Sequence, residues 1–73
     1  MFTATTQIND YTTGDATLTA TTLRGAKRQA ADKLELWTGD YDGNDVVVYE
    51  DGRPVCRARV RNGKAHGWTD LAL

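Results

Sequence analysis

The fold is decided by residues 46–69, which read VVVYEDGRPVCRARVRNGKAHGWT. Asp51-Gly52 and Asn62-Gly63 are both strong signals for two-residue β-turns of type I′, in which the two central residues need a positive φ. Each signal is flanked on both sides by strand-like runs. The stretch therefore predicts three consecutive antiparallel strands, over residues 46–50, 53–61 and 64–69. The first of them is apolar enough for a central strand.

Strand periodicity is also present at the N-terminus, where two kinds of side chain alternate. Phe2, Ala4, Thr6 and Ile8 fall on one face of a strand, with polar residues between them. A turn is expected over residues 11–15, around Gly14. A second strand is expected over residues 16–21, where alanine and leucine alternate with β-branched threonine.

Between these two groups of strands the period changes to that of a helix. Leu23, Ala26, Ala30 and Leu34 recur at helical spacing, and Thr22 precedes them as the N-cap. The helix is expected to end around residues 36–39, where a polar loop over residues 38–44 begins. The small alanines on its apolar stripe indicate that it lies close against a sheet.

The expected order of elements is ββαβββ. The economical arrangement is an α+β fold, in which one helix covers one face of a five-stranded antiparallel sheet. A length of 73 residues allows a single domain over residues 1–73. The longest apolar run is too short for a membrane span, and no signal peptide is expected because the basic and apolar segments of one are missing.

The residue counts argue against an enzyme or a metal site. One cysteine and one histidine cannot assemble the usual zinc sites. Cys56 is expected to face the core with Ala58 and Val60, where a thiol is inert, so a nucleophile–base pair with His66 is not expected. We therefore expect no catalysis, no metal and no cofactor.

Charge is segregated along the chain, although the net charge is only −1. Arg57, Arg59 and Arg61 are expected to point outward from one strand, about 7 Å apart. Like charges at this spacing repel one another, which favours a binding surface. The alternative is that an acidic residue on a neighbouring strand, such as Glu50, neutralises the row.

A second basic group is expected on the helix. Lys27 falls on the margin of the buried stripe, whereas Arg24 and Arg28 fall on the solvent side. The residues that we expect to bind a protein or a nucleic acid are Arg24, Lys27, Arg28, Lys33, Arg57, Arg59, Arg61 and Lys64.

Residues 40–52 contain five acidic residues and no basic residue. Asp40, Asp42 and Asn44 have the spacing of the first ligands in an EF-hand, but the sixth position requires glycine and holds Asp45. Calcium is therefore not expected. Instead, Asp40, Asp42 and Asp45 are predicted to form an acidic loop that docks on a basic partner.

Two segments resemble a known family. They are TLRGAKRQA at residues 22–30 and the ending Gly63-Lys64…Trp68-Thr69-Asp70. Both resemble the small phage-encoded anti-CRISPR proteins that inhibit type I (Cascade-type) surveillance complexes, closest to the ninth family directed at type I-F. Members share the ββαβββ order, a Ser/Thr-Leu-x-x-Ala-Lys-Arg helix start and a Gly-Lys…Trp-x-Asp ending. The resemblance covers nearly the whole chain as topology and fewer positions as residues.

The resemblance implies a phage or prophage protein that acts in the cytoplasm of the bacterial host. It implies docking on the Cas7 backbone subunits of a crRNA-guided complex, which prevents hybridisation of target DNA, and a loose hold on duplex DNA through basic residues. Lys27 and Arg28 match the basic pair at the start of the family's helix, and Lys64 matches the lysine of the last hairpin.

Two other classes of function remain open. A small nucleic-acid-binding module would act through the three arginines with Lys27 and Arg28, and would bind DNA or RNA without a partner protein. A non-enzymatic phage interaction protein would instead add a strand to a sheet edge near Phe2 or Pro54, either in a homo-oligomer or with another chain.

Overall fold

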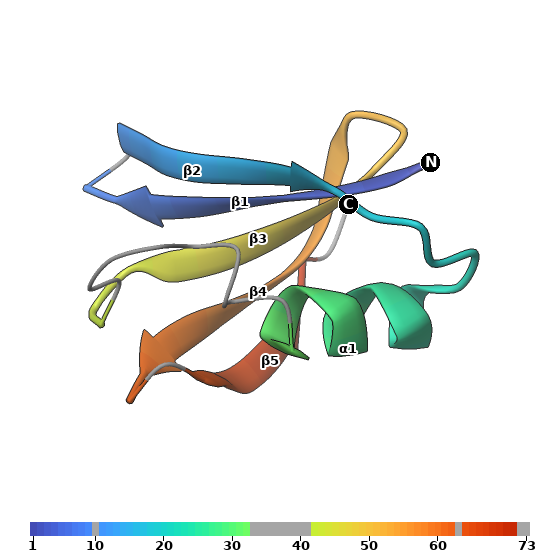
Figure 1. Cartoon of the computed structure of the whole chain (residues 1–73). Helices are drawn as coiled ribbons and strands as arrows, with labels where there is room; N and C mark the ends of the chain where they lie inside the picture. Colours follow the sequence, from blue (N-terminus) through green and yellow to red (C-terminus); the bar gives the residue numbers. More distant parts are fainter. Residues whose placement is uncertain (10, 33–41, 63, 72–73) are drawn as a thin grey trace.

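The computed structural model of the chain describes residues 1–9, 11–32, 42–62 and 64–71. The elements follow one another in the order ββαβββ (Figure 1). They are β1 (Phe2–Ile8), β2 (Tyr11–Thr17), α1 (Leu23–Asp32), β3 (Asp45–Glu50), β4 (Arg53–Arg61) and β5 (Lys64–Asp70). The predicted α+β class, with five strands and one helix, is confirmed.

All five strands form one antiparallel sheet, in the order β2-β1-β3-β4-β5. The middle strand is β3, as its apolar run predicts, and the edges are β2 and β5 (Figure 1). The edges predicted near Phe2 and Pro54 are wrong, because β1 and β4 each pair with a strand on both sides. The sheet tolerates Pro54 because it is the second residue of β4, beside a bulge in the pairing with β3.

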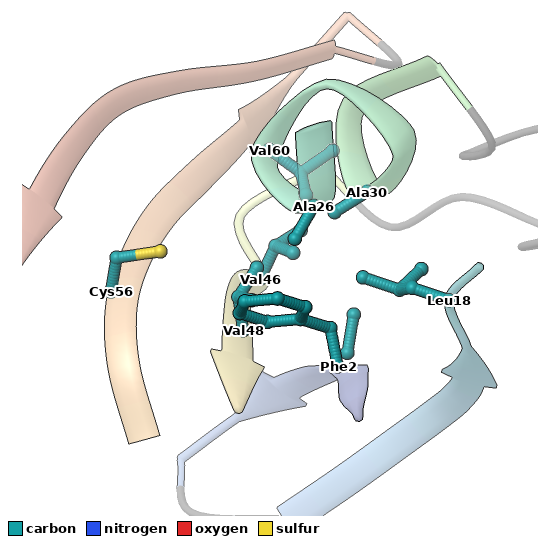
Figure 2. Close-up of a cluster of buried hydrophobic side chains, with 9 residues drawn as sticks. Phe2, Leu18, Ala26, Ala30, Val46, Val48, Cys56 and Val60 are labelled. Carbon is teal, nitrogen blue, oxygen red and sulfur yellow. The ribbon is translucent and has the colours of Figure 1, made fainter. Parts of the chain in front are cut away.

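The hydrophobic core lies between α1 and one face of the sheet (Figure 2). The helix contributes Ala26 and Ala30, whose small side chains allow its backbone to approach the strands closely. Removing such side chains from water is the main stabilising term in a domain this small. The sheet and the segment after β2 contribute Phe2, Ala4, Leu18, Val46, Val48, Cys56 and Val60.

The helix is fixed at its start by polar contacts. Thr22 is the N-cap, as predicted, because its Oγ1 accepts a hydrogen bond from the Gly25 backbone N–H at 3.1 Å. Gln29 Oε1 accepts hydrogen bonds from the backbone N–H groups of Thr19 and Ala20, both at 2.9 Å. The predicted end of the helix at residues 36–39 lies outside the described residues. Within them, no helix is both long and apolar enough to cross a membrane.

The turn predicted over residues 11–15 is wrong, because these residues belong to β2. The chain reverses earlier, where Asn9 adopts a φ of 49°. A bulge then leaves Thr13 as the extra residue, and its Oγ1 lies 2.9 Å from Thr6 Oγ1 and 2.7 Å from Asn44 Oδ1. Both Thr6 and Asn44 are buried, so the bulge satisfies polar groups that would otherwise be costly inside the protein.

The second strand predicted over residues 16–21 therefore begins earlier and ends at Thr17. Leu18 is still tied to β1, because its backbone N–H donates to Phe2 O at 3.0 Å. Its side chain turns into the core, which is why the apolar alternation continues past the end of the strand.

The two hairpins predicted from the sequence are confirmed by the pairing of β3 with β4 and of β4 with β5. Asp51 and Gly52 have φ values of 51° and 83°, and Asn62 has 53°. In β5 a bulge places two residues, Gly67 and Trp68, opposite a single residue of β4. Gly67 has a φ of 71°, which glycine adopts without steric cost.

Candidate functional site

The candidate site is the sheet face opposite α1, on the side of β4 that carries arginine. Cys56, Ala58 and Val60 are buried and alternate with Arg57, Arg59 and Arg61, which are exposed. Because successive strand side chains point to opposite faces, the three guanidinium groups project away from the helix. The predicted outward row is confirmed, and we call this surface the arginine face.

Strand β5 adds to the same face. Lys64 pairs with Arg61 and His66 pairs with Arg59, and both β5 side chains are exposed. Both pairings follow from the hairpin that joins β4 and β5. The bulge at Gly67 and Trp68 comes after them and shifts the alternation of β5 by one residue. Trp68 therefore packs against the core cluster instead of joining the arginine face.

Asp45 was predicted in an acidic docking loop, and this placement is wrong. It is the first residue of β3, pairs in register with Arg59, and forms ion pairs with Arg57 and with Arg59, the latter at 3.4 Å from Nε to Oδ1. The physical reason is the alternation of β3. Val46 and Val48 face the core, so Asp45 must face the arginines.

Glu50, the residue expected to neutralise the row, lies at the far end of β3. It pairs with Arg53 and has no salt bridge within the described residues. Neutralisation of the arginine face is therefore partial and comes from Asp45. Within the described part of the chain, neither Arg61 nor Lys64 has an ion-pair partner.

The arginine face is hollowed into an open groove of about 810 Å³ between β3, β4 and β5. Its walls offer guanidinium, amide and imidazole groups. The lining residues are Asp45, Arg57, Ala58, Arg59, Arg61, Asn62, His66 and Gly67. The three arginines face a single carboxylate, so the groove is suited to an anionic ligand.

The face continues over β1 as a neutral polar surface. Gln7 Nε2 donates hydrogen bonds to the Tyr49 hydroxyl at 2.9 Å and to Thr5 Oγ1 at 3.0 Å. Val47, which pairs with Thr5 and Arg57, is only 5% exposed although it lies on this face. Neighbouring side chains therefore cover Val47. Long side chains such as arginine can cover apolar surface with their aliphatic stems while the charged group stays in water.

The basic residues of α1 lie on the opposite side of the sheet from the arginine face. Arg24 and Arg28 are exposed, as predicted. Lys27 lies on the margin of the buried stripe and forms an ion pair with Asp70 of β5, at 3.4 Å from Nζ to Oδ1. The structure thus separates the eight predicted basic residues into two groups, except for Lys33, which lies outside the described residues.

The acidic loop is largely outside the described residues as well. Asp40 is not described, and Asp42 is exposed in the turn before β3. Within the described residues, no three histidine, cysteine, aspartate or glutamate side chains gather in a way that could hold a metal ion.

The residues that carry the family resemblance meet in space. Ala26 is buried beneath the helix, Lys27 pairs with Asp70, and Trp68 packs against the same core cluster. These four residues thus connect α1 to β5. Arg28 and Lys64 remain exposed and able to contact a partner.

Cys56 and His66 do not form a catalytic pair. The thiol is fully buried on the core side of β4, and burial raises its pKa, whereas His66 lies exposed on the arginine face. As the alternation of β4 predicts, the two groups lie on opposite faces of the sheet.

The chain was compared with protein-family models, with curated proteins and with solved structures, and it matches none of them.

Sequence reasoning missed two features of the site. The pairing of His66 with Arg59 could have been found by counting outward from the Asn62-Gly63 turn. The pairing of Asp45 with Arg59 could not, because a bulge between β3 and β4 shifts the register by one residue.

Proposed function

We propose that this protein is a non-enzymatic inhibitor of a type I crRNA-guided surveillance complex, and that it binds the complex through the arginine face. The observation that carries this proposal is the groove around Arg57, Arg59 and Arg61, in which one carboxylate faces three guanidinium groups. A surface of this kind favours a polyanionic partner, and a surveillance complex contains RNA and captures DNA.

Two further observations support the choice of this partner. The ββαβββ order is that of the anti-CRISPR family which the chain resembles. Lys64, which is exposed beside Arg61, stands at a position where the family carries a lysine. In this proposal the protein acts in the host cytoplasm, docks on the Cas7 backbone and prevents target DNA from hybridising.

In the proposed mechanism the protein occupies the path of target DNA on the complex and catalyses no reaction. Each arginine offers planar N–H donors that match the oxygens of a phosphate, so several together hold an extended anionic strand. Steric and electrostatic competition for the path of target DNA is then sufficient for inhibition.

The arginine face also favours a second candidate function, a free-standing nucleic-acid-binding module. Such a module would bind DNA or RNA without a partner protein, and its affinity would fall steeply with salt. The alternative of an interaction protein that pairs through a sheet edge would use β2 or β5, which are the two edges of the sheet.

The test is target-DNA binding by a panel of purified type I surveillance complexes, with and without this protein. We expect one complex to lose target binding, while a lane with DNA and this protein alone shows no shift at physiological salt. A shift of the DNA-only lane with every complex unaffected would favour the free-standing module. No effect in any lane, together with self-association, would favour the interaction protein.

A further inference from the structure

Asp45 lies where two grooves of the arginine face meet. One is the groove between β3, β4 and β5 described above. The other, of about 340 Å³, lies toward the end of β1 and is lined by Gln7, Ile8, Asn9, Gly43, Asp45, Arg57 and Arg59. The two share Asp45, Arg57 and Arg59, so these three residues stand at the centre of a trough that crosses the sheet.

The Asp45 carboxylate bridges the two guanidinium groups. Its Oδ2 accepts from Arg57 Nη2, and its Oδ1 accepts from Arg59 Nε at 3.4 Å. The arginine side chains remain 48% and 58% exposed, whereas that of Asp45 is only 23% exposed. Each carboxylate oxygen of Asp45 thus accepts a hydrogen bond from one arginine. The two free oxygens of a phosphodiester could accept the same two hydrogen bonds.

We infer that Asp45 is an internal counterion that occupies a phosphate position of the binding site, and that the backbone of a nucleic-acid strand displaces it. This rests on the proposed function and deepens it, because it names the component of the nucleoprotein partner that contacts the arginine face. Exchange of a carboxylate for a phosphate at Arg57 and Arg59 leaves both guanidinium groups paired before and after binding.

The lining of the trough favours nucleic acid over a folded protein. Protein interfaces depend on buried aromatic or aliphatic anchors, whereas nucleic-acid interfaces are polar and strongly positive. Among the described residues that line the two grooves, Ile8 is the only large apolar one, and none is Phe, Tyr or Trp. Without an aromatic platform for bases, the trough is suited to the backbone and insensitive to sequence.

The pairing of the strands gives the direction of the trough. Gln7, Asp45, Arg59 and His66 are paired in register across β1, β3, β4 and β5. Neighbouring members of this row are about 4.8 Å apart, the spacing between hydrogen-bonded strands. The phosphate backbone of a nucleic acid that follows this row passes over Asp45. The negative carboxylate repels the phosphates until Arg57 and Arg59 release it and pair with a phosphate instead.

The test compares Asp45→Asn with Asp15→Asn in binding a fluorescent oligonucleotide at low salt, where weak phosphate contacts become measurable. Asp15 is exposed in β2 and pairs with Thr5 on the same face, so the two variants change net charge equally. We expect Asp45→Asn to bind about fivefold more tightly than Asp15→Asn, and its salt dependence to steepen by about one phosphate contact. Equal affinities of the two variants would overturn the inference.

Two further measurements decide the remaining outcomes. If Asp45→Asn is unfolded by circular dichroism, the carboxyl carbon resonance of Asp45 is followed in the unaltered protein as oligonucleotide is added. A shift that saturates with binding supports displacement, and an unchanged resonance contradicts it. Polyglutamate at equal charge concentration should compete weakly; competition as strong as that of the oligonucleotide would overturn the choice of nucleic acid.

These outcomes are separable from those of the proposed function. Tighter oligonucleotide binding by Asp45→Asn, with no surveillance complex inhibited, would reject the inhibitor and keep the inference. Inhibition of a complex, with equal affinities of Asp45→Asn and Asp15→Asn for the oligonucleotide, would reject the inference and keep the inhibitor.

Discussion

At the scale of single residues, the alternation of β4 assigns opposite roles to neighbouring side chains. Cys56 is fully buried among apolar groups, while Arg57 beside it stands in the groove of the arginine face. A buried thiol keeps its proton because the low-dielectric interior disfavours the thiolate, which raises its pKa. A residue that looks reactive in the sequence is therefore part of the core.

The raised pKa of the Cys56 thiol predicts a pH dependence of stability. Above about pH 8.5 the unfolded thiol loses its proton and the folded one keeps it, so the folded state loses stability relative to the unfolded state. Between pH 8.5 and 9.5 we expect the free energy of unfolding to fall more steeply than in Cys56→Ala.

Urea unfolding at the two pH values measures this difference, with Cys56→Ala removing the thiol and correcting for all other titrating groups. Parallel behaviour of the two proteins would show that the Cys56 thiol ionises as readily in the folded state as in the unfolded chain.

At the scale of elements, the bulge in β5 determines which side chains reach the arginine face. Gly67 supplies the positive φ that the bulge needs. Because the bulge adds one residue to β5, His66 and Trp68, which would share a face in a regular strand, lie on opposite faces. A β-carbon at Gly67 would meet no atom within 4 Å, so a larger residue there is opposed by backbone conformation alone.

Gly67→Ala is therefore expected to destabilise the protein by about 1 kcal/mol, the order of the cost of left-handed backbone for alanine. Gly67→Asn should cost less, because asparagine tolerates this conformation better. Thermal unfolding of the two variants provides the comparison. Equal stability of Gly67→Ala and the unaltered protein would contradict the role given to this bulge.

The elements also show what sequence can and cannot predict. The two hairpins, the Thr22 cap and the outward arginines all follow from local patterns, and the structure confirms them. The position of the first turn does not follow from such a pattern. Gly14 suggests a turn because glycine tolerates a positive φ, but it lies within β2, and the chain reverses at Asn9 instead.

Partners across the sheet are the harder part to predict. Asp45 pairs with the arginines through a register that a bulge in the β3–β4 hairpin shifts by one residue, and the contact between Lys27 and Asp70 depends on where α1 packs. Neither relation is evident from a local sequence pattern.

At the scale of the whole molecule, the sheet separates two positive surfaces. The helix side presents Arg24 and Arg28, and the other side presents the arginine face. Lys27 on the helix is held by an ion pair with Asp70. If the arginine face is the functional surface, loss of charge on the helix side should matter much less than loss of charge in the groove.

The most direct measurement is the concentration of protein that halves target-DNA binding by the susceptible surveillance complex, for two variants of equal charge. One replaces Arg57, Arg59 and Arg61 with glutamine, and the other replaces Arg24, Arg28 and Arg53. We expect the groove variant to need at least about tenfold more protein, as loss of ~1.4 kcal/mol of binding free energy implies, and the matched variant to remain near the unaltered protein. The opposite order, or equal losses in both variants, would contradict the assignment of function to the arginine face.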